Sequence, residues 1–121
     1  MIDVIINPKD MEATYIQSLN ACFNNWGGIQ DYDWCFNRQL GILKSDIMIL
    51  KNEGKIIAGS GVTYREVKLA NNSITNVGII TGIWILPEAR GQGFFSKIVH
   101  ESRLLASKKG AALLIGFVTE N

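Results

Sequence analysis

The feature that most constrains this chain is a glycine-rich turn between an apolar run and a helical pattern, in residues 79–96, IITGIWILPEARGQGFFS. The β-branched run stops at Pro87, a charged and glycine-rich turn follows, and the helical pattern opens at Phe94. The first N–H groups of a helix have no partner inside it and lie at its positive end, so a strand, a glycine-rich turn and a helix in this order predict an anion site. Arg90 adds a permanent cation with a fork of donors. The sequence therefore predicts a ligand that carries phosphate.

Hydrophobic periodicity and turn residues divide the chain into strands and helices. Apolar runs predict five strands, over residues 1–6, 46–51, 56–69, 74–86 and 111–118. Helical spacing predicts three helices, one capped by Asp10 and ended by Gly27-Gly28, one over 30–40 and one over 94–109. The order β-α-α-β-β-β-α-β predicts an α/β fold with a mixed sheet, in which an antiparallel meander is followed by a crossover to a parallel last strand.

Composition limits the class of protein. With 121 residues the chain is one domain, and 47% apolar residues are enough for a core. The net charge of +1 argues against bulk attraction to nucleic acid or a membrane surface. One histidine and two cysteines without a CxxC pair predict no metal site. The first residues lack the layout of a signal peptide, so we expect a cytoplasmic protein with reduced thiols.

The turn and its setting resemble the GCN5-related N-acetyltransferases (GNAT). The signature of that family is Gln or Arg, two residues, Gly, one residue, then Gly or Ala, and this chain has Arg90-Gly91-Gln92-Gly93-Phe94-Phe95. The first five positions agree, and Phe95 stands where a small residue is usual. The resemblance extends over almost the whole chain, but over only about the first three-quarters of a usual domain. We therefore expect residues 1–121 to be a single, C-terminally incomplete N-acetyltransferase domain, truncated or completed by another chain.

The resemblance implies transfer of an acetyl group from acetyl-CoA to a primary amine of a small molecule or protein. Backbone N–H groups of the turn and helix start would hold the pyrophosphate. The edge of the strand over 74–86 would pair with the pantetheine arm, and this strand and the last would splay at the cofactor site. The cofactor-binding residues implied are Ile83, Trp84, Ile85, Arg90, Gly91, Gln92, Gly93, Phe94, Phe95, Ser96 and Asn121.

The residues do not identify a catalytic base. Several family members place a glutamate on the strand that corresponds to 74–86, and this chain has no acidic residue there. The candidates are Thr81, which can orient a water, and the carboxylates of Glu66, Asp31, Asp33 and Glu120. Each carboxylate is equally explained as a solvated surface group. The alternative function is therefore a non-catalytic module of the same fold that binds acyl-CoA or a protein partner.

Several other residues are expected to have structural roles. The aromatic and acidic segment 26–36 is either a small satellite core or a lid that suits a cationic amine. Expected packing residues are Cys22, Cys35, Phe94 and Phe95, whereas His100 falls on the polar face of its helix, and Gly59 and Gly61 are expected to mark a bulge or a close backbone approach. The apolar strand 111–118 lacks cover, which suggests a homodimer or an assembly completed by added strands.

Overall fold

The computed structural model describes residues 1–116, and its elements follow the predicted order. The strands are β1 (Ile2–Ile6), β2 (Asp46–Asn52), β3 (Lys55–Lys68), β4 (Ile74–Ile85) and β5 (Leu113–Gly116). The helices are α1 (Glu12–Cys22), α2 (Ile29–Phe36), the short 3-10 helix η1 (Pro87–Ala89) and α3 (Phe94–Lys108). The sheet order is β1-β2-β3-β4-β5, antiparallel throughout except for the parallel pair β4–β5. The predicted mixed sheet is confirmed.

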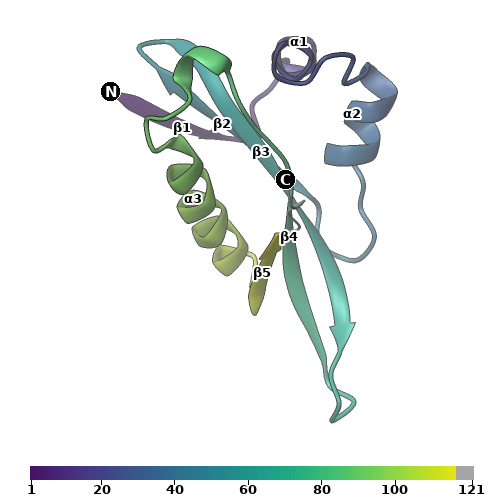
Figure 1. Ribbon diagram of the computed structural model, residues 1–121. Helices are drawn as coiled ribbons and strands as arrows, with labels where there is room; N and C mark the ends of the chain where they lie inside the picture. Colours follow the sequence, from purple (N-terminus) through teal and green to yellow (C-terminus); the bar gives the residue numbers. More distant parts are fainter. Residues whose placement is uncertain (117–121) are drawn as a thin grey trace.

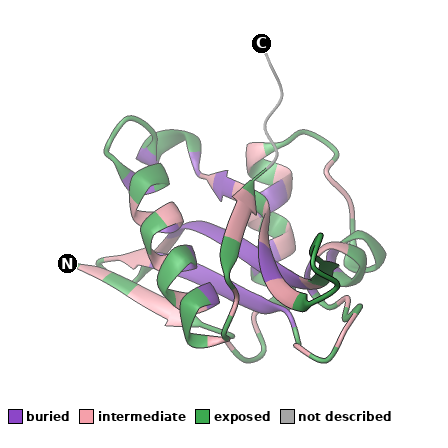
Figure 2. Ribbon diagram, turned by 90° about the horizontal axis from the view of Figure 1, so that it is seen from below, coloured by how far each residue is buried: buried purple, intermediate pink, exposed green. Residues whose placement is uncertain are grey.

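The twisted sheet separates two helical layers (Figure 1). Along β2, Ile47 and Ile49 pack with α1 and α2, whereas Met48 and Leu50 pack with α3. Successive side chains of a strand point to opposite faces, so α1 and α2 cover one face and α3 covers the other. Buried residues accordingly line the central strands between the helices (Figure 2).

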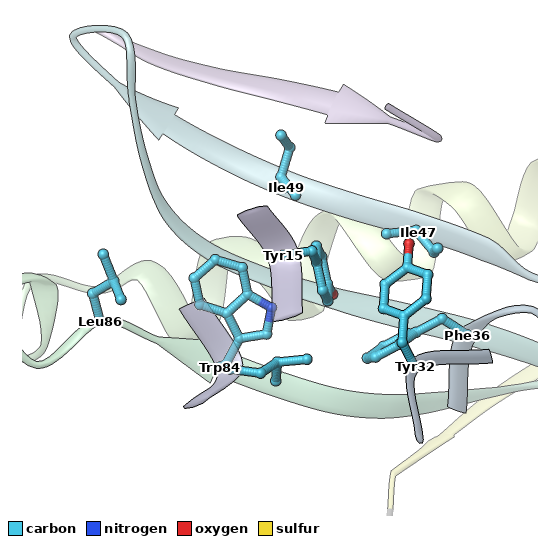
Figure 3. Packing of buried hydrophobic residues seen from close by; sticks show 8 residues of the cluster. Tyr15, Tyr32, Phe36, Ile47, Ile49, Trp84 and Leu86 are labelled. Carbon is cyan, nitrogen blue, oxygen red and sulfur yellow. The ribbon is translucent and has the colours of Figure 1, made fainter. Parts of the chain in front are cut away.

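The core beneath α1 and α2 is a cluster of aromatic rings around Trp84 (Figure 3). Trp84 is 1% exposed, and the Tyr15 ring meets it edge-on with centroids 5.3 Å apart. Tyr15 packs in the same way on Phe36, at 5.0 Å. An added Cβ on Gly59 would lie 2.7 Å from the Trp84 indole, and one on Gly61 would lie 2.6 Å from the Phe36 ring. The predicted close approaches are therefore confirmed, and each glycine makes room for one ring.

The opposite face packs against a single row of α3. Its buried members follow the four-residue spacing of a helix face, and they are Phe94, Ile98, Ser102 and Ala106. Phe94 packs the helix start onto the sheet as predicted, but the same prediction is wrong for Phe95, which is 53% exposed. The row through Phe94 already fills the space beneath the helix, so the next residue is turned away from it.

Three predicted helix boundaries are corrected. The first helix ends at Cys22 and not at Gly27-Gly28, because Phe23 is already extended, with φ −127° and ψ 105°. The second helix ends at Phe36 instead of residue 40, because Asn37 leaves helical geometry and the Ser45 hydroxyl donates to the Phe36 carbonyl. Asp10 does not cap α1, since it adopts a φ of 56° and the helix begins after Met11 without a side-chain cap. In the last strand the described pairing covers Leu113–Gly116, and residues 117–121, with the predicted splay of the two parallel strands, lie outside the described residues.

A buried carboxylate at the start of β2, Asp46, links several strands through its side chain. Asp46 is 3% exposed and accepts hydrogen bonds from Tyr64 Oη at 2.7 Å and Asn7 Nδ2 at 2.9 Å. Lys109 Nζ, at the end of α3, lies 3.6 Å from its Oδ1. Burial, and next the bond to Asp46, raise the pKa of Tyr64, so the phenol stays protonated and keeps donating. The network joins β1, β2, β3 and α3.

We expect Asp46→Ala to lower the free energy of unfolding by about 2–3 kcal/mol, because it leaves buried donors without an acceptor. The matched control is Asp33→Ala, whose exposed carboxylate accepts only from Asn37 and whose loss is expected to cost no more than about 0.5 kcal/mol. Urea denaturation of both variants measures the two losses in free energy of unfolding. Equal shifts of the two midpoints would show that the Asp46 network stabilises the fold no more than an exposed hydrogen bond does.

Candidate functional site

The predicted anion turn has the backbone geometry that its glycines suggest. Arg90 is extended, with φ −72° and ψ 155°, whereas Gly91 and Gly93 have φ values of 76° and 83°. An added Cβ on either glycine would meet nothing within 4 Å. The two glycines are therefore needed for left-handed backbone and not for space, because other residues rarely adopt such φ values. The turn lies exposed at the start of α3.

The N-terminus of α3 is open to an anion. Gly93 occupies the N-cap position, no side chain caps the helix, and its first turn holds no acidic residue. Lys97 N–H makes the first intrahelical bond, to Gly93 O at 3.3 Å, which leaves the N–H groups of Phe94, Phe95 and Ser96 before it. A helix of 15 residues ends there with uncompensated positive partial charge. The geometry favours a phosphate or carboxylate ligand.

Charged side chains around the turn strengthen this preference. Arg90 is exposed, and its Nε donates to Ile85 O at 3.0 Å, which holds the guanidinium beside the end of β4. The carboxylate in η1, Glu88, is paired with Lys55 at 3.0 Å. Bonds from its own backbone and from Lys55 lower the pKa of Glu88. Arg90 is thus the cation left for an external anion, while the acid next to it already has a partner.

A bulge interrupts β4 just before the turn. Gly59 pairs with Trp84 and Gly61 with Thr81, so two residues, Gly82 and Ile83, lie opposite Ser60 alone. Gly82 has a φ of 59°. The predicted irregularity is confirmed at this point, but the extra residue belongs to β4 and not to β3, because Gly82 supplies the left-handed backbone that such a bulge uses.

The residues after the bulge direct backbone groups to the open side of β4. Leu86 N–H donates to Ile57 O of β3 at 2.9 Å. Because strand residues alternate between the two edges, Trp84 also faces β3, whereas Ile83 and Ile85 face away. Among the described residues β5 pairs with β4 only from Val77 to Ile80. In that part of the chain the edge of β4 next to the turn therefore has no strand partner, and of its backbone groups Ile85 O accepts from side chains, Arg90 Nε and the Cys22 thiol.

A cavity of about 390 Å³ straddles this edge, and it is lined by Cys22, Phe23, Ile83, Ile85, Arg90 and Phe95. The Cys22 thiol donates to Ile85 O at 3.2 Å. Burial raises the pKa of Cys22, an effect that the nearby Arg90 opposes. The cysteine therefore serves as a neutral donor that ties the end of α1 to the end of β4, and it is half-buried, in agreement with its predicted packing role.

The second cavity at this place has a volume of about 640 Å³ and lies between α3 and the parallel pair of strands. Ile83 and Phe95 line it as well, so the two cavities meet at these side chains. Its other walls include Val99 and Arg103 of α3 and Leu114 of β5. Together the cavities form an apolar path that starts at the anion turn.

The sequence matches the family model for the acetyltransferase (GNAT) domain over residues 6–121. The chain belongs to the GNAT acetyltransferase family. The glycine turn at the start of α3 and the parallel β4–β5 pair, on which the predicted resemblance rested, are both present in the described residues. No curated protein matches the chain in sequence.

Solved structures of other proteins share the GNAT fold. AAC(6')-Iy in complex with the bisubstrate analog CoA-S-monomethyl-acetylneamine is 13% identical, with a TM-score of 0.78 over 100% of this chain and 82% of that one. A transcriptional regulator from Bacillus halodurans C-125 is 15% identical, with a TM-score of 0.77 over 99% of this chain and 83% of that one. Glucosamine-6-phosphate N-acetyltransferase from Arabidopsis thaliana is 16% identical, with a TM-score of 0.71 over 98% and 83%. At these identities the likeness establishes the fold alone.

The structure brings one of the candidate bases of this GNAT domain to the bulge. Thr81 directly precedes Gly82 and is half-buried beside Gly61. Glu66 pairs with Asn76, seven residues along β4 from Ile83, which places it roughly 20 Å away. The other candidate near the chain end, Glu120, and the predicted cofactor residue Asn121 lie outside the described residues.

The carboxylates of α2 already have partners. Asp31 accepts from the Gly28 N–H at 3.0 Å and caps the helix, and Asp33 accepts from Asn37 at 2.7 Å. The Arg38 guanidinium lies 4.2 Å from the centre of the exposed Trp34 ring. The remaining aromatic residues of the segment, Trp26, Tyr32 and Phe36, pack in the core, which favours the packing alternative for this segment over the lid.

Two residues of the candidate site were not predicted from the sequence, Phe23 and Gly82. Phe23 directly follows the first helix, at helical spacing from its apolar residues, and is 43% exposed at the cavity. The sequence signal that could have indicated a bulge at Gly82 is a lone glycine within a β-branched run, next to a predicted strand with two more glycines.

His100 is exposed on α3, as predicted. No helix within residues 1–116 is long and apolar enough to cross a membrane, and no group of three metal-ligating side chains occurs there.

Proposed function

We propose that this GNAT domain binds acetyl-CoA at the turn and transfers its acetyl group to a primary amine. The observation that carries the proposal is the uncapped start of α3 behind Gly91 and Gly93, with Arg90 beside it. This is a site for a phosphate-bearing ligand in a family of acetyltransferases. The related AAC(6')-Iy, whose structure contains a CoA-based bisubstrate analog, supports the choice of CoA.

The parts of the donor have separate proposed sites. The N–H groups from Gly91 to Ser96 and the side chain of Arg90 hold the pyrophosphate. Gln92 contributes through its backbone, because its side-chain amide already donates to Glu88 O at 3.2 Å. The backbone groups of Ile83 and the N–H of Ile85 pair with the amides of the pantetheine arm like an added strand, while Ile85 O stays bonded to Arg90 and Cys22. Trp84 supports this edge from the core, since its ring and its backbone groups face inward.

In the proposed reaction the neutral amine attacks the carbonyl carbon of the thioester. The C–N bond forms, the C–S bond breaks, and CoA leaves as a thiolate that takes up the proton released by the nitrogen. The Ile83 N–H, freed from the ladder at the bulge, is the proposed donor to the carbonyl oxygen. Thr81 is proposed to orient the water that first deprotonates the ammonium. Alignment of amine and thioester along β4 supplies much of the rate.

A non-catalytic module that binds acyl-CoA is the second candidate function. One observation favours it: β4 carries no acidic residue, and the carboxylate of Glu66 lies far along the hairpin. Such a module would keep the turn and the apolar path but would not turn the thioester over.

Calorimetry and a thiol-release assay separate these functions. We expect acetyl-CoA to bind with a Kd below about 1 mM and the release of CoA to depend on an added amine. The amines tested are an aminoglycoside, a polyamine, a free amino acid and a peptide with a free N-terminus. Binding without amine-dependent thiol release for any of them favours the module, and no binding at millimolar acetyl-CoA contradicts both functions.

A further inference from the structure

We propose that Phe23 and Phe95 form an aromatic clamp that holds the apolar part of the pantetheine arm against the free edge of β4. This inference rests on the proposed function. Both rings line the 390 Å³ cavity, and they are 43% and 53% exposed. Single exposed apolar side chains are common on protein surfaces. Two large rings that open onto one cavity at the end of an anion turn need a further explanation.

The two rings approach β4 from opposite faces of the sheet. Phe23 follows α1, on the face of Trp84, and Phe95 is the second residue of α3, on the other face (Figure 1). A cavity lined by both must therefore wrap around the edge of β4. The residues of β4 that line it are Ile83 and Ile85, whose backbone groups point to the same edge. A chain-like ligand that pairs with this edge would pass between the two rings.

The chemistry of the walls matches the arm of CoA. Arg90 is the one charged residue among the six that line the cavity, and the others are apolar or a neutral thiol. The arm of CoA carries a carbon with two methyl groups close to its pyrophosphate, followed by amides. With the pyrophosphate at Arg90 and the α3 start, this branched carbon comes next to the clamp.

The clamp explains why Phe95 stands where the family signature usually has a small residue. Phe94 already fills the buried position at the helix start, so Phe95 has no packing role in the core. Its ring is left to contact the ligand. A small residue at this position would give backbone access to the pyrophosphate, whereas Phe95 adds apolar surface beside the arm.

The test compares a ligand that has the arm with one that lacks it. CoA contains adenosine, the pyrophosphate and the arm, whereas ADP contains adenosine and the pyrophosphate but neither the arm nor the 3′-phosphate of CoA. We expect Phe23→Ala and Phe95→Ala each to weaken CoA binding roughly tenfold, with ADP binding changed less than about twofold. Phe95→Leu should retain most of the affinity for CoA. The matched control is Leu104→Ala, which removes a side chain that is 47% exposed on the same helix but lies outside the clamp.

Three results would overturn the clamp. The first is CoA binding that is unchanged in both alanine variants, the second is tighter binding by Phe95→Ala, which would mean that the ring obstructs the site, and the third is an equal loss for ADP. Thermal unfolding of each variant against Leu104→Ala verifies that the fold is retained. If the wild-type protein binds no CoA, the proposed function fails; if it binds CoA and the variants do not differ from it, only the clamp fails.

Discussion

Gly93→Asp is expected to weaken CoA binding at least about 100-fold, equivalent to about 2.8 kcal/mol, while the protein remains folded. The new carboxylate would stand at the N-cap of α3, where the pyrophosphate is proposed to bind. Repulsion between unit charges about 5 Å apart is worth about 3 kcal/mol at the effective dielectric of a protein surface. A carboxylate near a helix start stabilises the helix by about 0.3–1 kcal/mol, which offsets part of the strain of a side chain at a φ of 83°. Gly93→Asp is therefore expected to reduce the affinity for CoA strongly while changing the free energy of unfolding only slightly.

The chain supplies a matched control for this substitution at the other end of the same helix. Gly110 has a φ of 82°, and an added Cβ there also meets nothing within 4 Å. Gly110→Asp thus introduces the same charge and the same backbone strain away from the turn. Calorimetric titration with CoA should give the wild-type Kd for Gly110→Asp. Equal losses of affinity in the two variants would mean that the turn does not hold the phosphates.

Trp84→Ala is expected to lower the free energy of unfolding by about 3–5 kcal/mol, because it empties the largest buried site of the core. The indole is 1% exposed, meets the Tyr15 ring edge-on and fills the space above Gly59. Along β4, Trp84 is the residue between Ile83 and Ile85, whose backbone forms the proposed ligand edge, so any variant that remains folded should also bind CoA less well. Urea denaturation with a linear extrapolation measures the first effect.

Trp34→Ala is the matched control for size and chemistry. Trp34 is 65% exposed, and its loss removes only the contact with Arg38 at 4.2 Å. An exposed contact of this kind is worth about 0.5–1 kcal/mol. If Trp34→Ala shifts the urea midpoint as far as Trp84→Ala does, the aromatic cluster around Trp84 is not the centre of this core.

The order of elements could be predicted from the sequence because each one carries a local signal. The β-branched runs gave the strands, and the glycine turn before Phe94 gave the start of α3. The errors arose where tertiary contacts decide. The Ser45 hydroxyl ends α2 by a bond to the Phe36 carbonyl, over nine residues of separation, and periodicity cannot reveal such a partner.

The site could be predicted only in part, for a related reason. The turn is local in sequence, so Arg90 to Ser96 could be recognised together. The free edge of β4 depends on pairing with β3 and on the bulge at Gly82, which local patterns do not specify. Phe23 reaches the cavity because α1 ends beside β4, 60 residues later in the chain. Trp84, predicted within the cofactor-binding stretch, lies in the core because β4 alternates its side chains.

The most direct test of a CoA site at this turn is a titration of isotopically labelled protein with CoA, followed by the backbone amide resonances. We expect the largest shifts at the N–H groups of Gly91, Gly93, Phe95 and Ser96, together with those of Ile83 and Ile85 on the β4 edge. No shifts at millimolar CoA, or shifts confined to another part of the molecule such as the surroundings of Asp46, would contradict a CoA site at this turn.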